Sequence, residues 1–364
     1  MNRRQALAAA LLGTLGLAGC RRQPPVAGPA PAAPPPAAAF AWTMVTAWPR
    51  DYPGLDAAAR DFARRVALMS GGRLSIEVFA ADERVPALAV FDAVSRGKAQ
   101  LGHGAAHYWA ERTPAAPFFA AVPFGLSADE SLAWLRHGGG QALWDEAYAP
   151  FGVKPLPAGN GGAQLGGWFN REIRSLQDFE GLRVHMPGLG GEVLKRFAAI
   201  PQTLAVQAVP AALYDGSIDA AAGGSPSDDL AGGLAQLARF CYYPGWQAPQ
   251  SPLELLVNRK AWDGLPADLQ AIVEEAARGS GQLLLDAYTA ANAQAVEELR
   301  RQGVELRRLP DELLAALHHE SEQVLELQAS RNELNGRIWA SLKAFRGPAG
   351  ELRRLTAGSL AHWR

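Results

Sequence analysis

Short apolar runs and longer amphipathic segments alternate along the chain from residue 41 onward. In order, they predict a strand at Ala41–Thr46, a helix at Leu55–Met69, a strand at Leu74–Phe79, a helix at about 85–96 and a short strand at 99–102. The third segment shows the pattern well, because Leu74, Ile76 and Val78 alternate with polar positions. Strands that alternate with helices in this way are typical of a mostly parallel sheet covered by helices.

The same pattern occurs a second time and is followed by long helical segments. The second set comprises strands near 162–169, 183–186 and 202–206 and a helix at 191–199. After it come a strand at 253–258, a helix at 266–300 and one or two long helices over 310–345. Leu313, Leu317 and Val324 lie on one apolar stripe of the last segment. We expect these C-terminal helices to pack on the chain's own body or on a second copy rather than on a third protein.

Residues 1–20 have the features of a bacterial export signal. Arg3 and Arg4 precede a short apolar run, and Leu17–Cys20 closes it with small residues before the cysteine. This arrangement predicts a lipoprotein signal peptide with Cys20 as the lipid-carrying residue, the alternative being an ordinary signal with a chance cysteine. Export through the Sec or the twin-arginine route stays open. We therefore predict a periplasmic protein anchored to a bacterial membrane through Cys20.

Composition limits the other classes of function. Residues 21–39, rich in Pro and Ala, predict an extended linker. Cys241 is the only cysteine besides Cys20, so no disulfide framework is predicted. The 35 basic and 36 acidic residues are balanced, and no basic block suggests a nucleic-acid partner. About 325 residues follow the linker, which suggests two domains.

Three blocks in the middle of the chain carry a family resemblance. They are Asn160–Phe169, Leu182–Gly191 and Ile218–Asp229. The chain resembles the solute receptors of tripartite ATP-independent periplasmic (TRAP) transporters, in particular their 2-oxo-acid branch. The resemblance covers roughly residues 41–345 and includes the segments 44–49, 85–97, 121–125, 137–141, 148–152, 242–246 and 265–273.

The resemblance implies an α/β, two-lobed fold like that of type II periplasmic binding proteins, with hinge strands between discontinuous domains. We place lobe I at 40–159 with about 247–290. Lobe II is placed at 160–246 with about 291–345, including the long C-terminal helices, and a tail at 346–364. A homodimer through the C-terminal helices also occurs in this branch.

The resemblance also points to ligand-binding positions, several of which are altered in this chain. Gln164 matches the Gln of the family, which helps to coordinate a metal cation and the substrate. His185 stands where the family typically has Arg, and Ala222 and Gly223 stand where it has Glu and Trp. Hard cations need several oxygen ligands with carboxylate charge, so we predict no cofactor and no metal bound in the family manner. Gln164 is at most a weak residual ligand.

Other side chains are candidates for contact with the solute. His185 either contacts the ligand or only lines the cleft, and its charge would matter only near or below a pKa of about 6.5. Arg183, two residues earlier on the same strand face, either replaces the missing Arg or is solvated. Further candidates are Asn160, Trp48, Tyr108, Phe124 and Trp246, with core packing as the alternative for the aromatic residues. Capping is the simpler interpretation of the adjacent Asp228 and Asp229.

No catalytic constellation is evident. Gly188–Gly191 lacks a full dinucleotide motif, His103 and His107 lack a third ligand, and no nucleophile elbow occurs. We predict a non-enzymatic receptor that closes on a small organic acid and delivers it to the membrane permease subunits of a TRAP transporter. The alternative is a non-transport lipoprotein on the same scaffold, either a sensor-associated binding protein or a structural envelope protein.

Overall fold

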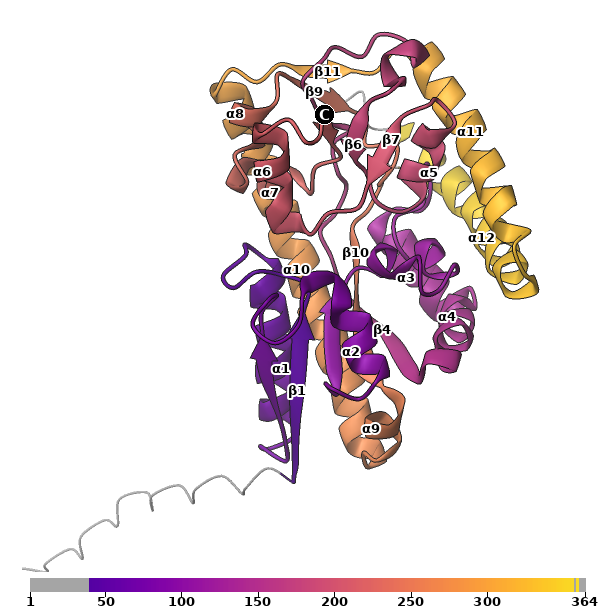
Figure 1. Cartoon of the computed structure of the whole chain (residues 1–364). Coiled ribbons are helices and arrows are strands. Elements are labelled where there is room, and N and C mark those ends of the chain that lie inside the picture. Colours follow the sequence, from indigo (N-terminus) through magenta and orange to yellow (C-terminus); the bar gives the residue numbers. More distant parts are fainter. Residues whose placement is uncertain (1–38, 357, 360–364) are drawn as a thin grey trace, which may run out of the picture. The chain divides into compact units, whose positions relative to one another are not determined.

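The structure is a computed structural model that describes residues 39–356, 358 and 359. The predicted signal peptide with Cys20, the linker up to residue 38 and the last residues of the chain lie outside the described residues. The described chain contains two sheets, each covered by helices (Figure 1). No helix of the described part is long and apolar enough to cross a membrane.

The first sheet has the order β2-β1-β3-β10-β4. Its strands are β1 (Phe40–Thr46), β2 (Leu74–Phe79), β3 (Leu101–Gly104), β4 (Val153–Asn160) and β10 (Pro252–Asn258). The second sheet has the order β11-β9-β5-β8-β6-β7. Its strands are β5 (Gly167–Phe169), β6 (Arg183–His185), β7 (Ile200–Gln202), β8 (Ala220–Ala221), β9 (Phe240–Tyr243) and β11 (Leu306–Arg308).

Both sheets are mixed, whereas the sequence pattern predicted a mostly parallel sheet. Strand β10 runs antiparallel to both of its neighbours, β3 and β4, and β5 runs antiparallel to β8 and β9. The physical reason is the path of the chain, since β10 enters the first sheet from the second and therefore runs against the local strands. The chain passes between the sheets from β4 to β5, from β9 to β10 and, through the two helices that follow β10, to β11. Each sheet is thus built from discontinuous segments of the chain. The exact residue boundaries of the two lobes remain a prediction.

Two of the crossing segments are hydrogen-bonded to each other. The Gly161 and Gln164 backbone N–H groups donate to the carbonyl oxygens of Ser251 and Ala248 at 2.9 and 3.2 Å. Asn160 joins the same two segments, because its Oδ1 accepts from the backbone N–H of Ser251 at 3.1 Å and its Nδ2 donates to Gln250 Oε1 at 2.8 Å. The two passages therefore form one paired connection.

The helices surround the sheets, and one of them reaches both. They are α1 (Leu55–Met69), α2 (Val90–Ser95), α3 (Ala128–His137), α4 (Gly140–Tyr148), α5 (Leu189–Lys195), α6 (Val209–Tyr214), α7 (Pro226–Ala231), α8 (Leu234–Leu237), α9 (Arg259–Asp263), α10 (Ala267–Arg301), α11 (Asp311–Ala329) and α12 (Glu333–Leu355). Helix α10 packs against α1 and β4 and also against α7 beside the second sheet. Along its length Val273, Leu284 and Leu299 are buried in three different hydrophobic clusters. Burial of this apolar stripe stabilises the long helix more than local propensity does.

Most predicted elements are confirmed, with differences at their ends. The helix at Leu55–Met69 and the strand at Leu74–Phe79 have the predicted bounds. The last helical segment divides into α11 and α12, which lie side by side and pack on α5 and on α3 and α4 (Figure 1). Asn332 separates them, because its side chain accepts the Asn335 N–H and caps α12. Helix α12 continues to Leu355, beyond the predicted start of the tail at residue 346.

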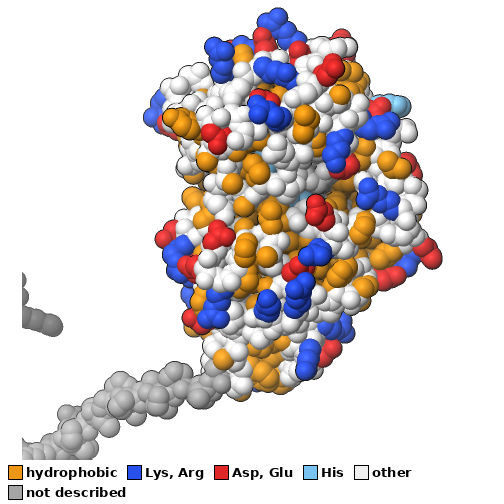
Figure 2. Space-filling model, in the orientation of Figure 1, with side chains coloured by type: hydrophobic (Ala, Val, Ile, Leu, Met, Phe, Trp, Pro, Cys, Tyr) orange, Lys and Arg blue, Asp and Glu red, His pale blue; other side chains and the backbone are white. Residues whose placement is uncertain are grey.

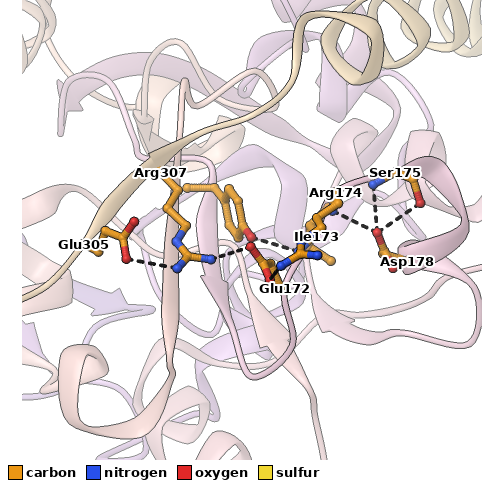
Figure 3. Close-up of polar contacts among 8 residues, drawn as sticks. Glu172, Ile173, Arg174, Ser175, Asp178, Glu305 and Arg307 are labelled. Atoms are coloured by element: carbon orange, nitrogen blue, oxygen red, sulfur yellow. Dashed lines mark hydrogen bonds and ion pairs between the residues drawn. The ribbon is translucent and has the colours of Figure 1, made fainter.

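Ionic contacts join the outer strand of the second sheet to a neighbouring loop (Figure 3). Arg307 on β11 forms ion pairs with Glu172 at 2.6 Å and with Glu305 at 2.9 Å. Beside it, the Ile173 backbone N–H donates to Tyr242 Oη at 2.8 Å. Such exposed pairs each contribute about 0–1 kcal/mol. Acidic and basic side chains are interspersed over the face shown in Figure 2, in keeping with the balanced composition.

A buried carboxyl group lies in the first sheet. Glu254 on β10 is 1% exposed and accepts hydrogen bonds from Trp109 Nε1 and from Tyr148 Oη, the latter at 3.1 Å. Burial raises the pKa of this carboxyl to about 8. The folded protein therefore holds a proton on Glu254 that an unfolded chain would release near pH 4.

We expect Glu254→Gln to flatten the dependence of stability on pH. Because the folded pKa lies above the unfolded value, the contribution of Glu254 is complete below about pH 4 and is lost as the pH rises towards 8. The wild-type free energy of unfolding should fall faster between pH 5 and 8, by up to about 1.4 kcal/mol per pH unit. Urea unfolding of both proteins across this range measures the difference. Parallel curves would show that Glu254 titrates normally.

Candidate functional site

A cavity of about 160 Å³ lies between residues of the two sheets. The first sheet and its loops contribute Trp48, Tyr52, His107 and Tyr108 to the lining. The second sheet and its loops contribute His185, the glycines after β8, and the two aspartates of α7. Gln164 and Gln247 come from the crossing segments, and Tyr288 comes from α10. Pockets for drug-sized ligands measure roughly 300–1,000 Å³. This cavity therefore suits a smaller solute.

The wall from the first sheet contains aromatic side chains that contact one another. Trp48 follows β1, and its Nε1 donates to His103 Nδ1 at 2.7 Å. Since Nδ1 accepts this bond, the proton of the neutral His103 lies on Nε2, which faces the Ala158 carbonyl at 3.4 Å. Burial lowers the pKa of His103 to about 4, so the ring stays neutral at pH 7. The ring of Trp48 also packs against Tyr108, with centroids 6.2 Å apart.

His185 lies at the end of β6, where the predicted cleft strand meets the cavity. Its ring is 8% exposed, and Nδ1 accepts the Leu204 backbone N–H at 3.3 Å. Burial lowers the pKa of His185 to about 4, with a smaller opposing effect from the Gln202 backbone. The side chain is therefore a neutral group at pH 7 and does not replace the charge of an Arg.

The carboxyl groups of Asp228 and Asp229 line the cavity on the side of the second sheet. Asp229 accepts the Trp168 indole N–H at 2.8 Å and the Gly224 backbone N–H at 2.7 Å. Asp228 accepts Ser225 Oγ at 2.9 Å in a capping box of α7 and Tyr288 Oη at 2.9 Å. Burial raises the pKa of Asp229 to about 8 and raises that of Asp228 as well.

Gly223 has no room for a side chain because of Asp229. A Cβ added at this glycine would overlap both carboxylate oxygens of Asp229. The Asp229 carboxyl group therefore occupies the space that the Cβ atom of any other residue at position 223 would need. The absence of a side chain here leaves room for the buried acid and does not simply widen the cavity.

The structure brings four of the eight predicted ligand residues to the cavity. These four are Trp48, Tyr108, Gln164 and His185. Gln164 donates through Nε2 to Ser251 Oγ at 3.0 Å. Asn160 lies beside the cavity and joins the two crossing segments.

The other three predicted residues have contacts elsewhere. Arg183 is half-exposed and forms a two-point ion pair with Asp219 through bonds of 2.6 and 2.9 Å, which holds its guanidinium away from the cavity. Phe124 and Trp246 pack on each other with centroids 6.0 Å apart, and Phe124 also packs on His318. These residues support the walls without lining them.

Several lining residues were not predicted from the sequence as ligand contacts. Capping was the simpler interpretation of Asp228, and the capping box exists, yet both aspartates also face the cavity. Tyr52, Gln247 and Tyr288 were not candidates, because they lie in segments far from the three blocks. The one signal in the sequence was the pair of acids directly after Pro226 and Ser227.

Two sheets built from discontinuous segments, with a small cavity between them, are the arrangement of an extracytoplasmic solute-binding protein. The chain belongs to the bacterial extracellular solute-binding protein family 7 (DctP), whose model matches residues 44–332. It is therefore a periplasmic solute-binding protein of the TRAP type, and the family is one of transport receptors rather than enzymes. Membership confirms the predicted family, fold and non-enzymatic class.

Three relatives illustrate the similarity. A monocarboxylate 2-oxoacid-binding periplasmic protein of Nostoc sp. is 41% identical over 305 residues, which are 84% of each chain. A TRAP solute-binding protein of Pseudoalteromonas atlantica, solved with bound sodium and pyruvate, is 33% identical with a TM-score of 0.86, over 89% of this chain and 98% of that one. One of Colwellia psychrerythraea, with bound calcium and pyruvate, is 31% identical with a TM-score of 0.87, over 89% and 99%.

The residues of this chain do not fit a hard cation held as the family resemblance implies. Ala222 has no side-chain oxygen at the position where the family has the Glu carboxylate. Within the described residues no group of three or more His, Cys, Asp or Glu side chains is arranged to hold a metal. The carboxyl groups of Asp228 and Asp229 are buried and already accept hydrogen bonds from protein donors. A hard cation needs several oxygen ligands with charge among them.

We expect Gly223→Ala to destabilise the protein by about 1–3 kcal/mol, because the new methyl group overlaps the Asp229 carboxyl and forces it from the Trp168 indole. Thermal unfolding measures the effect. Gly350→Ala on α12 is the matched control, since an added Cβ there meets nothing within 4 Å. The control should be neutral or slightly stabilising. Equal melting temperatures for Gly223→Ala and wild type would contradict the packing described here.

Proposed function

We propose that this protein binds a small carboxylic acid in the cavity between the two sheets and delivers it to the permease subunits of a TRAP transporter. The observation that carries the proposal is the cavity of about 160 Å³, lined from both sheets and from the paired crossing segments. One relative of this chain is named as a monocarboxylate 2-oxoacid-binding protein, and two others have been solved with bound pyruvate. The volume suits a ligand of that size.

Binding couples to transport through the arrangement of the walls. A solute that touches residues of both sheets favours the conformation in which the sheets approach, and it does so only through its higher affinity for that conformation. The crossing segments then act as the hinge, with Asn160 as the link between them. The permease is expected to distinguish the closed receptor from the open one.

The carboxylate of the ligand would be held by neutral donors. No Lys or Arg occurs among the described residues that line the cavity. His185 accepts through Nδ1, so its Nε2 carries the proton and can donate. Gln164 has a second amide N–H besides the one that bonds Ser251. Several such donors around a buried carboxylate offset part of its desolvation.

We expect His185→Ala to weaken binding of the acid about tenfold or more, because one of few donors is lost. Isothermal titration calorimetry with small oxo, hydroxy and amino monocarboxylic acids of two to five carbons measures affinity. His319→Ala, an exposed position on α11, is the control. Because the pKa of His185 lies near 4, the effect should be the same at pH 6 and pH 8. Failure of every acid in this panel to bind would overturn the proposed function.

We further propose that Cys20 is lipidated and tethers the receptor, and that two copies associate through α11 and α12. Leu327 on α11 and Leu352 and Leu355 on α12 support the second part, because they are 58%, 64% and 68% exposed. Cys20→Ser should release the protein from the membrane fraction of the expressing cells. Sedimentation equilibrium should give twice the monomer mass. Membrane retention of the variant contradicts the anchor, and a monomer at micromolar concentration contradicts the dimer.

A further inference from the structure

Three side chains from the loops of the first sheet line the cavity without a hydrogen-bond partner of their own. Tyr52 follows β1, and His107 and Tyr108 follow β3. Because β1 and β3 are parallel neighbours, the loops at their carboxyl ends meet at one edge of the sheet. Among the described residues none hydrogen-bonds to the two hydroxyl groups or to the His107 ring. Trp48 on the same wall differs, since its indole N–H is bonded to His103.

The three side chains lie close to one another and to the other groups of the lining. The rings of His107 and Tyr108 are in contact, with centroids 4.6 Å apart. Burial raises the pKa of Tyr52, with smaller contributions from the two aspartates of α7 and from Tyr108. These contributions place the Tyr52 hydroxyl among groups that line the cavity. Burial lowers the pKa of His107, and the nearby His185 lowers it further, so the two histidines face each other from opposite walls.

The two walls touch beside His107. A Cβ added at Gly188, in the loop after His185, would lie 3.1 Å from the Cβ of His107. Gly188 has a φ of 70° and precedes α5, so its backbone passes directly beside the first sheet's loop. A ligand bound by the His107 ring therefore lies where the second sheet approaches the first.

At neutral pH these side chains are hydrogen-bond donors. Burial raises the pKa of both tyrosine hydroxyls, so each keeps its proton. His107 has a pKa of about 4 and is neutral at pH 7, which leaves one ring N–H to donate. Asp228 does not require the Tyr52 hydroxyl, because its oxygens already accept from Tyr288 and Ser225. The donors thus lack acceptors within the protein, which costs free energy unless a ligand supplies them.

We propose that Tyr52, His107 and Tyr108 form a donor group that receives the carboxylate and oxo oxygens of the ligand. This inference rests on the proposed function, since it assigns residues of the same cavity to recognition of the acid. A 2-oxo acid anion has three acceptor oxygens and no donor, which matches three donors in the lining. With His185 on the opposite wall, one ligand is held from both sheets, and its recognition favours their approach.

The first test uses the wild-type protein and does not depend on the folding of any variant. Calorimetry in buffer with sodium and calcium compares pyruvate with propionate, 2-oxobutyrate with butyrate, and 2-oxopentanoate with pentanoate. Each second acid keeps the carboxylate and the chain length but lacks the oxo acceptor. We expect the oxo acid to bind about tenfold or more tightly, because its partner leaves a donor unpaired. Equal affinities within the pairs would overturn the donor group.

The second test removes the donors one at a time in Tyr52→Phe, Tyr108→Phe and His107→Phe, each of which keeps an aromatic ring. Each variant should bind the oxo acid about tenfold or more weakly than wild type. Since the removed groups have no described protein partner, the melting temperature of the ligand-free variants should not fall. His107→Gln keeps an N–H donor and should bind more tightly than His107→Phe.

Two exposed positions provide matched controls for these variants. Tyr214→Phe, at a side chain that is 83% exposed at the end of α6, and His137→Phe, at an exposed position on α3, should bind as wild type does.

The outcomes separate this inference from the proposed function. If a variant of the donor group binds within about threefold of wild type, the three-residue group is overturned and the carboxylic-acid receptor stays in place. Absence of binding of every oxo acid to the wild-type protein overturns both.

Discussion

The carboxyl group of Asp229 determines the form of the site. It is 1% exposed, joins α7 to β5 through the Trp168 indole, and accepts the Gly224 N–H from the loop after β8. These bonds fix the wall of the second sheet and require glycine at 223. They also place an acid in a cavity where its ionisation is costly. The missing side chains at 222 and 223 and the buried acid are therefore parts of one arrangement.

That arrangement limits which solutes the receptor can accept. The first sheet contributes aromatic rings, the histidines are neutral, and the crossing segments contribute three side-chain amides. A ligand must supply acceptors for these neutral donors, whose hydrogen bonds offset part of the desolvation of its carboxylate. Contact with both walls then links this selection to closure, because the crossing segments that bear Gln164 and Gln247 also connect the sheets.

The sequence predicted the scaffold well because periodicity and family blocks report on local structure. Leu55–Met69 and Leu74–Phe79 were predicted to the residue, and His185 and Gln164 were placed at the cavity. The antiparallel course of β10 was missed because pairing direction depends on where the chain returns. Tyr288 and Gln247 were missed because they join the site only through tertiary packing. Arg183 shared a strand with His185, but pairing with Asp219 directs it elsewhere.

The solute cavity contains a buried acid, Asp229, and no Lys or Arg among the described residues that line it. Carbon-13 NMR titration of the aspartate side-chain carboxyl groups in the ligand-free protein measures this most directly. We expect Asp229 to titrate with a pKa of about 8, far above the usual value of about 4 for this residue type. Titration of Asp229 at or below pH 4 would mean that a positive charge already stabilises its carboxylate, and would contradict a cavity without a cationic partner for this acid.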